Sequence, residues 1–123
     1  MEGTRILVVE DEYLLAEDLR RSLERRGAVV VGPAPSVPAA EKLLAAGMAV
    51  DFAVLDINLA GTSAYPIADT LARSGIPFAF VSGFEKSIIP ERFVGITVFE
   101  KPLDFRLLCD AISAGLKIGH KES

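Results

Sequence analysis

Six polar residues of this sequence stand directly behind short apolar runs. They are Glu10, Asp11, Glu12, Asp56, Ser82 and Lys101. If the chain brings them together, the carboxylates would repel one another and raise one another's pKa unless a cation compensates. Mg²⁺, or Mn²⁺ in its place, fits such a set, because one or two carboxylates, water and an anionic phosphate oxygen are its usual ligands. The residue types therefore predict a divalent metal site that also accommodates a phosphate group.

Asp56 has the residue type of a carboxylate nucleophile, which can form an aspartyl phosphate. Phosphoryl transfer also needs charge neutralised on the oxygens of the transferring group. The metal ion can neutralise one oxygen, the Lys101 ammonium another, and the Ser82 hydroxyl with a backbone N–H can bind the third. We therefore expect a phosphoacceptor that assists its own phosphorylation and dephosphorylation, and no conventional enzyme.

Strand-like and helical segments alternate around these residues. Apolar runs typical of strands cover residues 5–9, 28–31, 52–55, 76–81 and 96–99. Helical patterns cover residues 13–26, about 36–47 and 67–73, and a C-terminal helix carries Leu108 and Ile112 on its apolar stripe. Gly32 and Pro33 are expected to end the second strand. Between residues 84 and 95, Pro90 allows at most a short or irregular helix.

This alternation predicts an α/β fold with short, right-handed connections and helices on both faces of a parallel sheet. We expect a flavodoxin-like, doubly wound, five-stranded sheet with the strand order 2-1-3-4-5. In such sheets ligands bind beyond the carboxyl ends of the strands, where the strand order reverses. All six polar residues belong to that edge, so the fold itself is expected to assemble the site.

Composition restricts the remaining possibilities. The 123 residues suit one domain, and no apolar run approaches the roughly 20 residues that span a bilayer, so membrane insertion is not expected. The net charge of −4 disfavours direct nucleic-acid binding. The N-terminus lacks a secretory pattern, and the single Cys109 fits a reducing compartment, which together predict a cytoplasmic protein with Cys109 as a small core residue.

Each motif taken alone has a plainer explanation. Acidic residues behind a strand often do no more than favour the dipole of the next helix, and this applies to Glu10, Asp11 and Glu12. Lys-Pro at position 101 and Ser-Gly at position 82 are common loop and turn pairs. The functional interpretation depends on their joint placement at successive strand ends.

The sequence resembles the receiver domain of bacterial two-component response regulators. The resemblance rests on four pieces and covers about residues 5–116. They are Val8-Val9-Glu10-Asp11-Glu12, Leu55-Asp56-Ile57-Asn58-Leu59, Val81-Ser82-Gly83 and Glu100-Lys101-Pro102. It implies that Glu10 and Asp11 are the acidic metal-binding pair, that Asp56 is the phosphoacceptor and that the backbone carbonyl of Asn58 is a metal ligand. It also implies that Ser82 is the switch residue and that Lys101 contacts the phosphoryl group.

The resemblance implies a function in phosphorelay signal transduction. The phosphoryl group would come from a sensor histidine kinase or a histidine phosphotransferase. We expect a stand-alone receiver over residues 1–123, with its core at about 5–118 and no output domain. Such a protein signals by contact with a downstream protein, which the sequence does not identify, or acts as a phosphate sink.

Two departures from the family pattern point to a subgroup. Receivers commonly have a movable aromatic residue three positions before the lysine, and here that residue is Val98. The irregular segment 84–95 also lies where receivers usually have a full helix. Both features resemble the FATGUY subgroup of single-domain receivers, whose motif is approximated by Phe80-Val81-Ser82-Gly83-Phe84. This resemblance implies that phosphorylation is read out through residues 84–95.

Other functions fit less well. An adaptor that keeps the fold but is never phosphorylated stays open, although every residue the chemistry needs is present. A phosphohydrolase of the haloacid dehalogenase type needs a second aspartate two residues after the nucleophile, and Asn58 cannot donate that proton. Flavin binding is disfavoured, because Glu10, Asp11 and Glu12 would repel a phosphate that no metal bridges.

Overall fold

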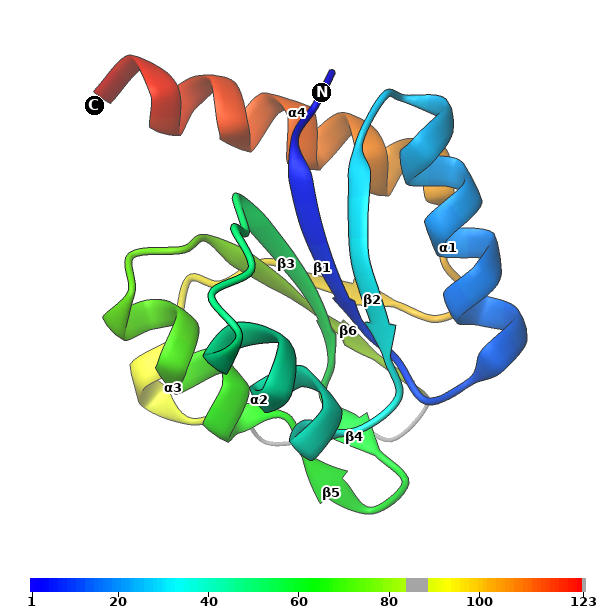
Figure 1. Ribbon diagram of the computed structural model, residues 1–123, viewed down its shortest axis with the longest axis vertical. Helices are drawn as coiled ribbons and strands as arrows, with labels where there is room; N and C mark the ends of the chain where they lie inside the picture. The colour runs from blue at the N-terminus through cyan, green and yellow to red at the C-terminus, as the bar shows by residue number, and fades with distance from the viewer. Residues whose placement is uncertain (84–88, 123) are drawn as a thin grey trace.

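Five parallel strands form the central sheet of the computed structural model, in the order β2-β1-β3-β6-β7 (Figure 1). They are β1 (Arg5–Val9), β2 (Val29–Ala34), β3 (Phe52–Asp56), β6 (Phe78–Ser82) and β7 (Val98–Glu100). The structure describes residues 1–83 and 89–122, with side chains up to residue 115. The order confirms the predicted flavodoxin-like sheet, because strands 1 to 5 of the prediction correspond to β1, β2, β3, β6 and β7.

Helices cover both faces of this sheet (Figure 1). Helices α1 (Tyr13–Arg25) and α4 (Phe105–Glu122) lie on one face, and α2 (Val37–Ala45) and α3 (Tyr65–Arg73) lie on the other. Side chains along a strand point alternately to the two faces. Ile6 and Val8 of β1 therefore pack with α1 and α4, while Leu7 and Val9 pack with α2 and α3.

The strand register brings the strand ends to one level. Val9 is paired with Leu55, Asp56 with Val81, and Ser82 with Glu100. The residues behind these strand ends therefore emerge side by side at the carboxyl edge of the sheet, as the parallel arrangement predicts.

Strand β2 is longer than predicted. It does not end at Gly32 and Pro33 but runs on to Ala34, with an irregular register opposite Leu7 and Val9 and a cis Gly32–Pro33 bond. The edge position of β2 tolerates a proline, and Gly32 has a φ of +92°, which a side chain would disfavour. The extension matters for the site, because the N–H of Glu10 donates to the carbonyl of Ala34 at 3.0 Å.

A small antiparallel hairpin behind β3 was not predicted. It consists of β4 (Asn58–Leu59) and β5 (Thr62–Ser63), and α3 begins at Tyr65 rather than at residue 67. Both β6 and β7 begin two residues later and end one residue later than predicted. The short 3₁₀ helix η1 (Glu91–Phe93) is the only helix in the described part of residues 84–95, while the predicted readout residues 84–88 lie outside the described residues.

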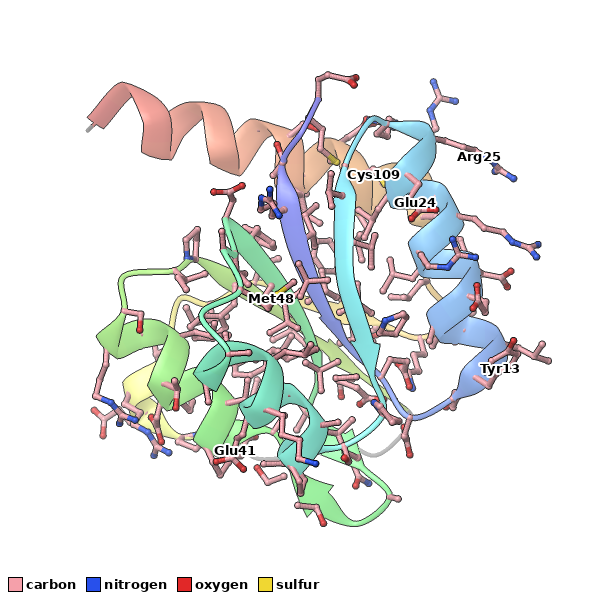
Figure 2. All side chains as sticks on the ribbon, in the orientation of Figure 1. Tyr13, Glu24, Arg25, Glu41, Met48 and Cys109 are labelled. Carbon is pink, nitrogen blue, oxygen red and sulfur yellow. The ribbon has the colours of Figure 1, made fainter. Side chains whose placement is uncertain are left out.

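The structure agrees with two sequence-based interpretations of core residues, of which Cys109 is labelled in Figure 2. Cys109 points into the core between α4 and the sheet, is 2% exposed, and has its pKa raised by burial. Val98 and Phe99 pack against opposite core clusters, so Phe99 is a core residue on the α1 and α4 face. No helix within residues 1–83 and 89–122 is long and apolar enough to cross a membrane.

Candidate functional site

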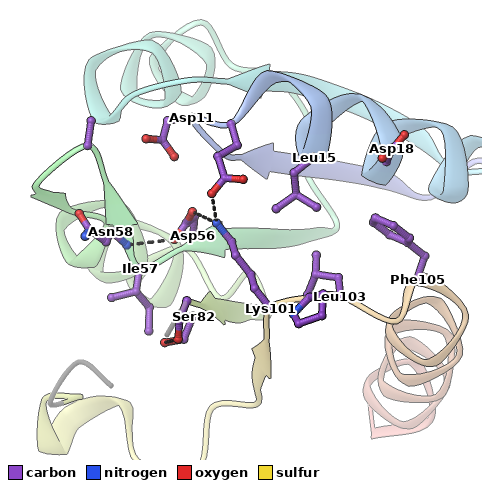
Figure 3. A pocket seen from close by; sticks show the side chains of 14 residues that line it. Asp11, Leu15, Asp18, Asp56, Ile57, Asn58, Ser82, Lys101, Leu103 and Phe105 are labelled. Carbon is purple, nitrogen blue, oxygen red and sulfur yellow. Dashed lines mark hydrogen bonds and ion pairs between the residues drawn. The ribbon is translucent and has the colours of Figure 1, made fainter. Parts of the chain in front are cut away.

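A pocket of about 830 Å³ opens at the carboxyl edge of the sheet (Figure 3). Five of the predicted site residues line it. They are Asp11, Asp56, Asn58, Ser82 and Lys101. Glu10 does not line the pocket and is buried, with 3% of its surface exposed. The structure thus brings every predicted site residue to this edge, together with Glu12.

The carboxylates of Glu10, Asp11 and Asp56 converge at the carboxyl edge of the sheet. One oxygen of each lies within 4.8 Å of the others, so a cation between them can contact more than one. The pKa of Glu10 is raised to about 8, chiefly by burial and also by the nearby Asp56, although the Glu12 N–H and Lys101 act to lower it. The negative charge of the three carboxylates is thus not fully compensated. Their oxygen atoms are the kind of ligand that Mg²⁺ and Mn²⁺ prefer.

Lys101 is the cation that the protein itself supplies. It reaches from behind β7 to within 2.8 Å of Asp56 Oδ2, and Figure 3 shows its ammonium between Asp56 and the start of α1. Its ammonium also lies 3.4 Å from Glu10 Oε1 and 3.0 Å from Glu12 Oε1. Burial alone would lower the pKa of Lys101, but the hydrogen bonds to Asp56 and Glu12 raise it above its ordinary value. Lys101 is therefore charged at neutral pH.

The second oxygen of Asp56 is held by the backbone. Its Oδ1 atom accepts a hydrogen bond from the N–H of Asn58 at 3.1 Å. The side chain of Asn58 turns away to accept from the N–H of Gly61 at 2.8 Å, which closes the turn between β4 and β5. The unpredicted hairpin thus fixes the backbone that orients Asp56. The carbonyl of Asn58 as a metal ligand stays a prediction.

Ser82 lies at the end of β6 and is buried. Its hydroxyl donates to the carbonyl of Gly83 at 3.5 Å, which is a long and weak contact. Among the described residues, no hydrogen bond joins it to Asp56 or Lys101. The hydroxyl is therefore close to the site but not committed to a strong partner.

Sequence reasoning missed two features of the pocket. Glu12 was counted among the acidic residues without a role, although its carboxylate accepts a hydrogen bond from Lys101. Leu15, Leu103 and Phe105 form an apolar end of the pocket between α1 and the start of α4. Nothing in the sequence indicates which way the Glu12 side chain turns, whereas the apolar residues could have been noticed from their positions near the strand ends.

Comparison with known proteins agrees with this geometry. Residues 6–113 match the model of the response regulator receiver domain. The chain belongs to this family. Receiver domains are signal-transduction modules of two-component systems, and they bind Mg²⁺ through acidic residues such as those clustered here. They interact with histidine kinases.

Two curated relatives match most of this receiver. The sensory transduction protein RegX3 of Mycolicibacterium smegmatis is 34% identical over 94% of this chain and 52% of its own length. The uncharacterized transcriptional regulatory protein YbdJ of Bacillus subtilis is 28% identical over 88% of this chain and 48% of its own length. The receiver thus spans about half the length of these relatives.

Solved structures share the fold. SdrG from Sphingomonas melonis superposes with a TM-score of 0.79 at 35% identity, over 91% of this chain and 95% of that chain. The response regulator PhyR from Brucella abortus superposes with a TM-score of 0.80 at 26% identity, over 98% of this chain and 50% of that chain.

Proposed function

We propose that this receiver accepts a phosphoryl group on Asp56, from a phosphohistidine of a sensor histidine kinase or a histidine phosphotransferase. The observation that carries the proposal is the position of Asp56. Its carboxylate is buried, lies 2.8 Å from the Lys101 ammonium and shares a cluster with Glu10 and Asp11. This combination supplies a nucleophile, a fixed positive charge and a set of metal ligands at one point.

In the proposed reaction the two carboxylate oxygens of Asp56 have different roles. One oxygen attacks the phosphorus while the bond from phosphorus to the donor imidazole nitrogen breaks, and the imidazole leaves with the electron pair. The N–H of Asn58 holds the other oxygen. Lys101 neutralises charge on the transferring group, and the Ser82 hydroxyl is free to rotate toward one of its oxygens. Water later hydrolyses the acyl phosphate, which returns Asp56 to its carboxylate form.

The metal ligands in this proposal are Glu10, Asp11, Asp56 and the backbone carbonyl of Asn58. When bound, Mg²⁺ or Mn²⁺ supplies charge neutralisation for the phosphoryl oxygens. The raised pKa of Glu10 supports the assignment, because it indicates that Lys101 alone does not compensate the negative charge of the buried carboxylates.

The proposal also includes the subgroup, the cellular location and the mode of signalling of this receiver. We place it in the cytoplasm as a stand-alone receiver of the FATGUY subgroup that signals by protein contact or serves as a phosphate sink. Support comes from the match along nearly the whole solved SdrG chain, from Val98, and from η1 in the described part of residues 84–95. Detection of the natural protein in cells at the mass of 123 residues tests the stand-alone assignment.

Intact-mass spectrometry after incubation with acetyl phosphate and Mg²⁺ tests the phosphorylation. We expect the wild type to gain one phosphate that hydroxylamine removes, and Asp56→Asn to gain none. Asp110→Asn is the matched control, because it removes a surface carboxylate of α4 that pairs with Arg26. Phosphate on Asp56→Asn, or none on the wild type, would contradict the proposal. The second outcome would favour an adaptor that is never phosphorylated.

Beryllofluoride offers a second test, since a structure of SdrG is described as the BeF3-activated conformation. With Mg²⁺ and beryllofluoride, we expect backbone amide NMR signals to shift at the metal site and along residues 82–95. Changes confined to the metal site would count against a readout through that segment.

A further inference from the structure

Glu12 occupies an unusual position for its residue type. It directly precedes α1 as the N-cap residue, yet its side chain caps no backbone N–H of the helix. Its carboxylate turns into the pocket instead and accepts a hydrogen bond from Lys101 Nζ at 3.0 Å. The backbone N–H of Glu12 donates to Glu10 Oε2 at 3.0 Å, which anchors the main chain at this point. The carboxylate is therefore aimed at Lys101 from a fixed backbone.

The ammonium of Lys101 is surrounded by three carboxylates, and it donates hydrogen bonds to two of them. It has three N–H donors, and its partners are Asp56 at 2.8 Å, Glu12 at 3.0 Å and Glu10 at 3.4 Å. A phosphoryl group on Asp56 competes with these carboxylates for the ammonium, and the most exposed carboxylate is the one that gives way most readily. Asp56 and Glu10 are buried, whereas the Glu12 side chain is 61% exposed and can exchange Lys101 for water.

We propose that Glu12 is a positioning residue for Lys101, which holds the ammonium at the pocket mouth and releases it when a phosphoryl group binds to Asp56. The inference rests on the proposed phosphorylation of Asp56. Since the contact with Glu12 is lost on release, Glu12 opposes formation of the phosphorylated state. Removing its charge favours that state.

The size of this opposition follows from the exposure of Glu12. Exposed ion pairs contribute little, and removing one changes an equilibrium by about twofold to fivefold. Glu12→Gln keeps the length of the side chain and removes only the charge. Because the carboxylate caps nothing, the variant leaves the start of α1 intact, and its unfolding equilibrium is expected to change by no more than about the same twofold to fivefold.

The test measures the affinity of the protein for beryllofluoride in the presence of saturating Mg²⁺. We expect Glu12→Gln to bind about twofold to fivefold more tightly than the wild type, and Glu12→Asp to lie between them. Asp18→Asn is the matched control, since it removes one negative charge from α1 at the opposite end of the pocket from Asp56 (Figure 3). We expect it to bind as the wild type does.

A second measurement does not need the phosphoryl analogue. The ¹³Cε NMR signal of Lys101 in the free protein is expected to shift in Glu12→Gln and to stay in place in Asp18→Asn. An unshifted signal together with unchanged affinity would overturn the role of Glu12. Equal tightening in both variants would also overturn it, because the effect would then be general electrostatic repulsion. If the wild type binds no beryllofluoride while the Lys101 signal shifts, the proposed function fails and the contact stands.

Discussion

Raising the pH in the absence of divalent cations is expected to destabilise this receiver. The cause is Glu10, whose carboxyl group is 3% exposed and has a pKa raised to about 8 by burial and by the nearby Asp56. A raised pKa means that the folded state binds the proton more tightly than the unfolded chain. The stability that comes from this proton is complete below about pH 4.5 and is lost as the pH rises to about 8.

The magnitude follows from the two pKa values. A rise from 4.5 to about 8 corresponds to an upper limit of about 5 kcal/mol, at about 1.4 kcal/mol for each pKa unit. Other groups also titrate over this range, so the effect of Glu10 has to be isolated. Glu10→Gln does so, because glutamine has the same shape and stays neutral.

The assay is urea unfolding of both proteins at a series of pH values in EDTA. We expect the wild type to lose stability relative to Glu10→Gln as the pH rises from 4.5 to 8 and the two to run parallel above that range. Adding Mg²⁺ at pH 8 should stabilise the wild type more than Glu10→Gln, with a gain of about 2.7 kcal/mol at a hundredfold excess over Kd. Parallel curves over the whole range would refute the electrostatic account of Glu10.

Three further predictions concern the fold, and urea unfolding checks each of them. Phe93→Ala is expected to cost about 3–5 kcal/mol, because this ring is buried against three other rings, whereas the exposed Val94→Ala should change stability by less than about 0.5 kcal/mol. Gly32→Ala should destabilise by more than about 1 kcal/mol, since its φ is +92° and its Cβ would lie 2.7 Å from the backbone N of Ala34; a neutral result would contradict the strain. Gly115→Ala should stabilise α4 by up to about 1 kcal/mol, because a Cβ there meets no atom of the described residues within 4 Å, and a loss of stability would contradict this prediction.

The sheet could be predicted from sequence because its strands are buried on both faces. Such strands appear as continuous apolar runs, and β1 was predicted at its observed bounds. The errors arose where local signals compete with tertiary structure. Gly32 and Pro33 are typical of a strand end, yet the edge position of β2 accommodates them. The hairpin of β4 and β5 has strands of two residues, which are too short to produce a periodic pattern.

The site was predictable to the level of which residues meet, but not of how they interact. Parallel strands deliver their carboxyl ends to one edge, so Asp56 and Lys101 were expected at the same edge, although β6 lies between their strands. The hydrogen bond of Lys101 to Glu12 and the turn of the Asn58 side chain toward Gly61 depend on rotamers. Rotamers follow from packing and charge in three dimensions, which a single sequence does not contain.

The replacement of an aromatic residue by Val98 has a structural counterpart. The core face that contains Val98 is filled by rings from other elements, namely Phe80 of β6, Tyr65 of α3 and Phe93 of η1. The Tyr65 ring lies 5.8 Å from that of Phe80 and 5.5 Å from that of Phe93, and Phe80 and Phe93 are also 5.5 Å apart. Phe80 lies two residues before Ser82 on the same strand. Its ring contacts therefore connect the strand that carries Ser82 to η1 and α3.

The contact between η1 and α3 therefore limits what a readout through residues 84–95 can be. Arg92 donates hydrogen bonds to both carboxylate oxygens of Asp69, at 2.8 and 3.1 Å, and its guanidinium lies 4.5 Å from the centre of the Phe93 ring. Expelling Phe93 from the core would cost about 1.5–3 kcal/mol of hydrophobic burial. A shift of η1 that keeps Phe93 buried avoids this cost and needs only the exposed Arg92 pair to rearrange. The proposed readout is thus more consistent with a pivot of η1 about Phe93 than with its release from the domain.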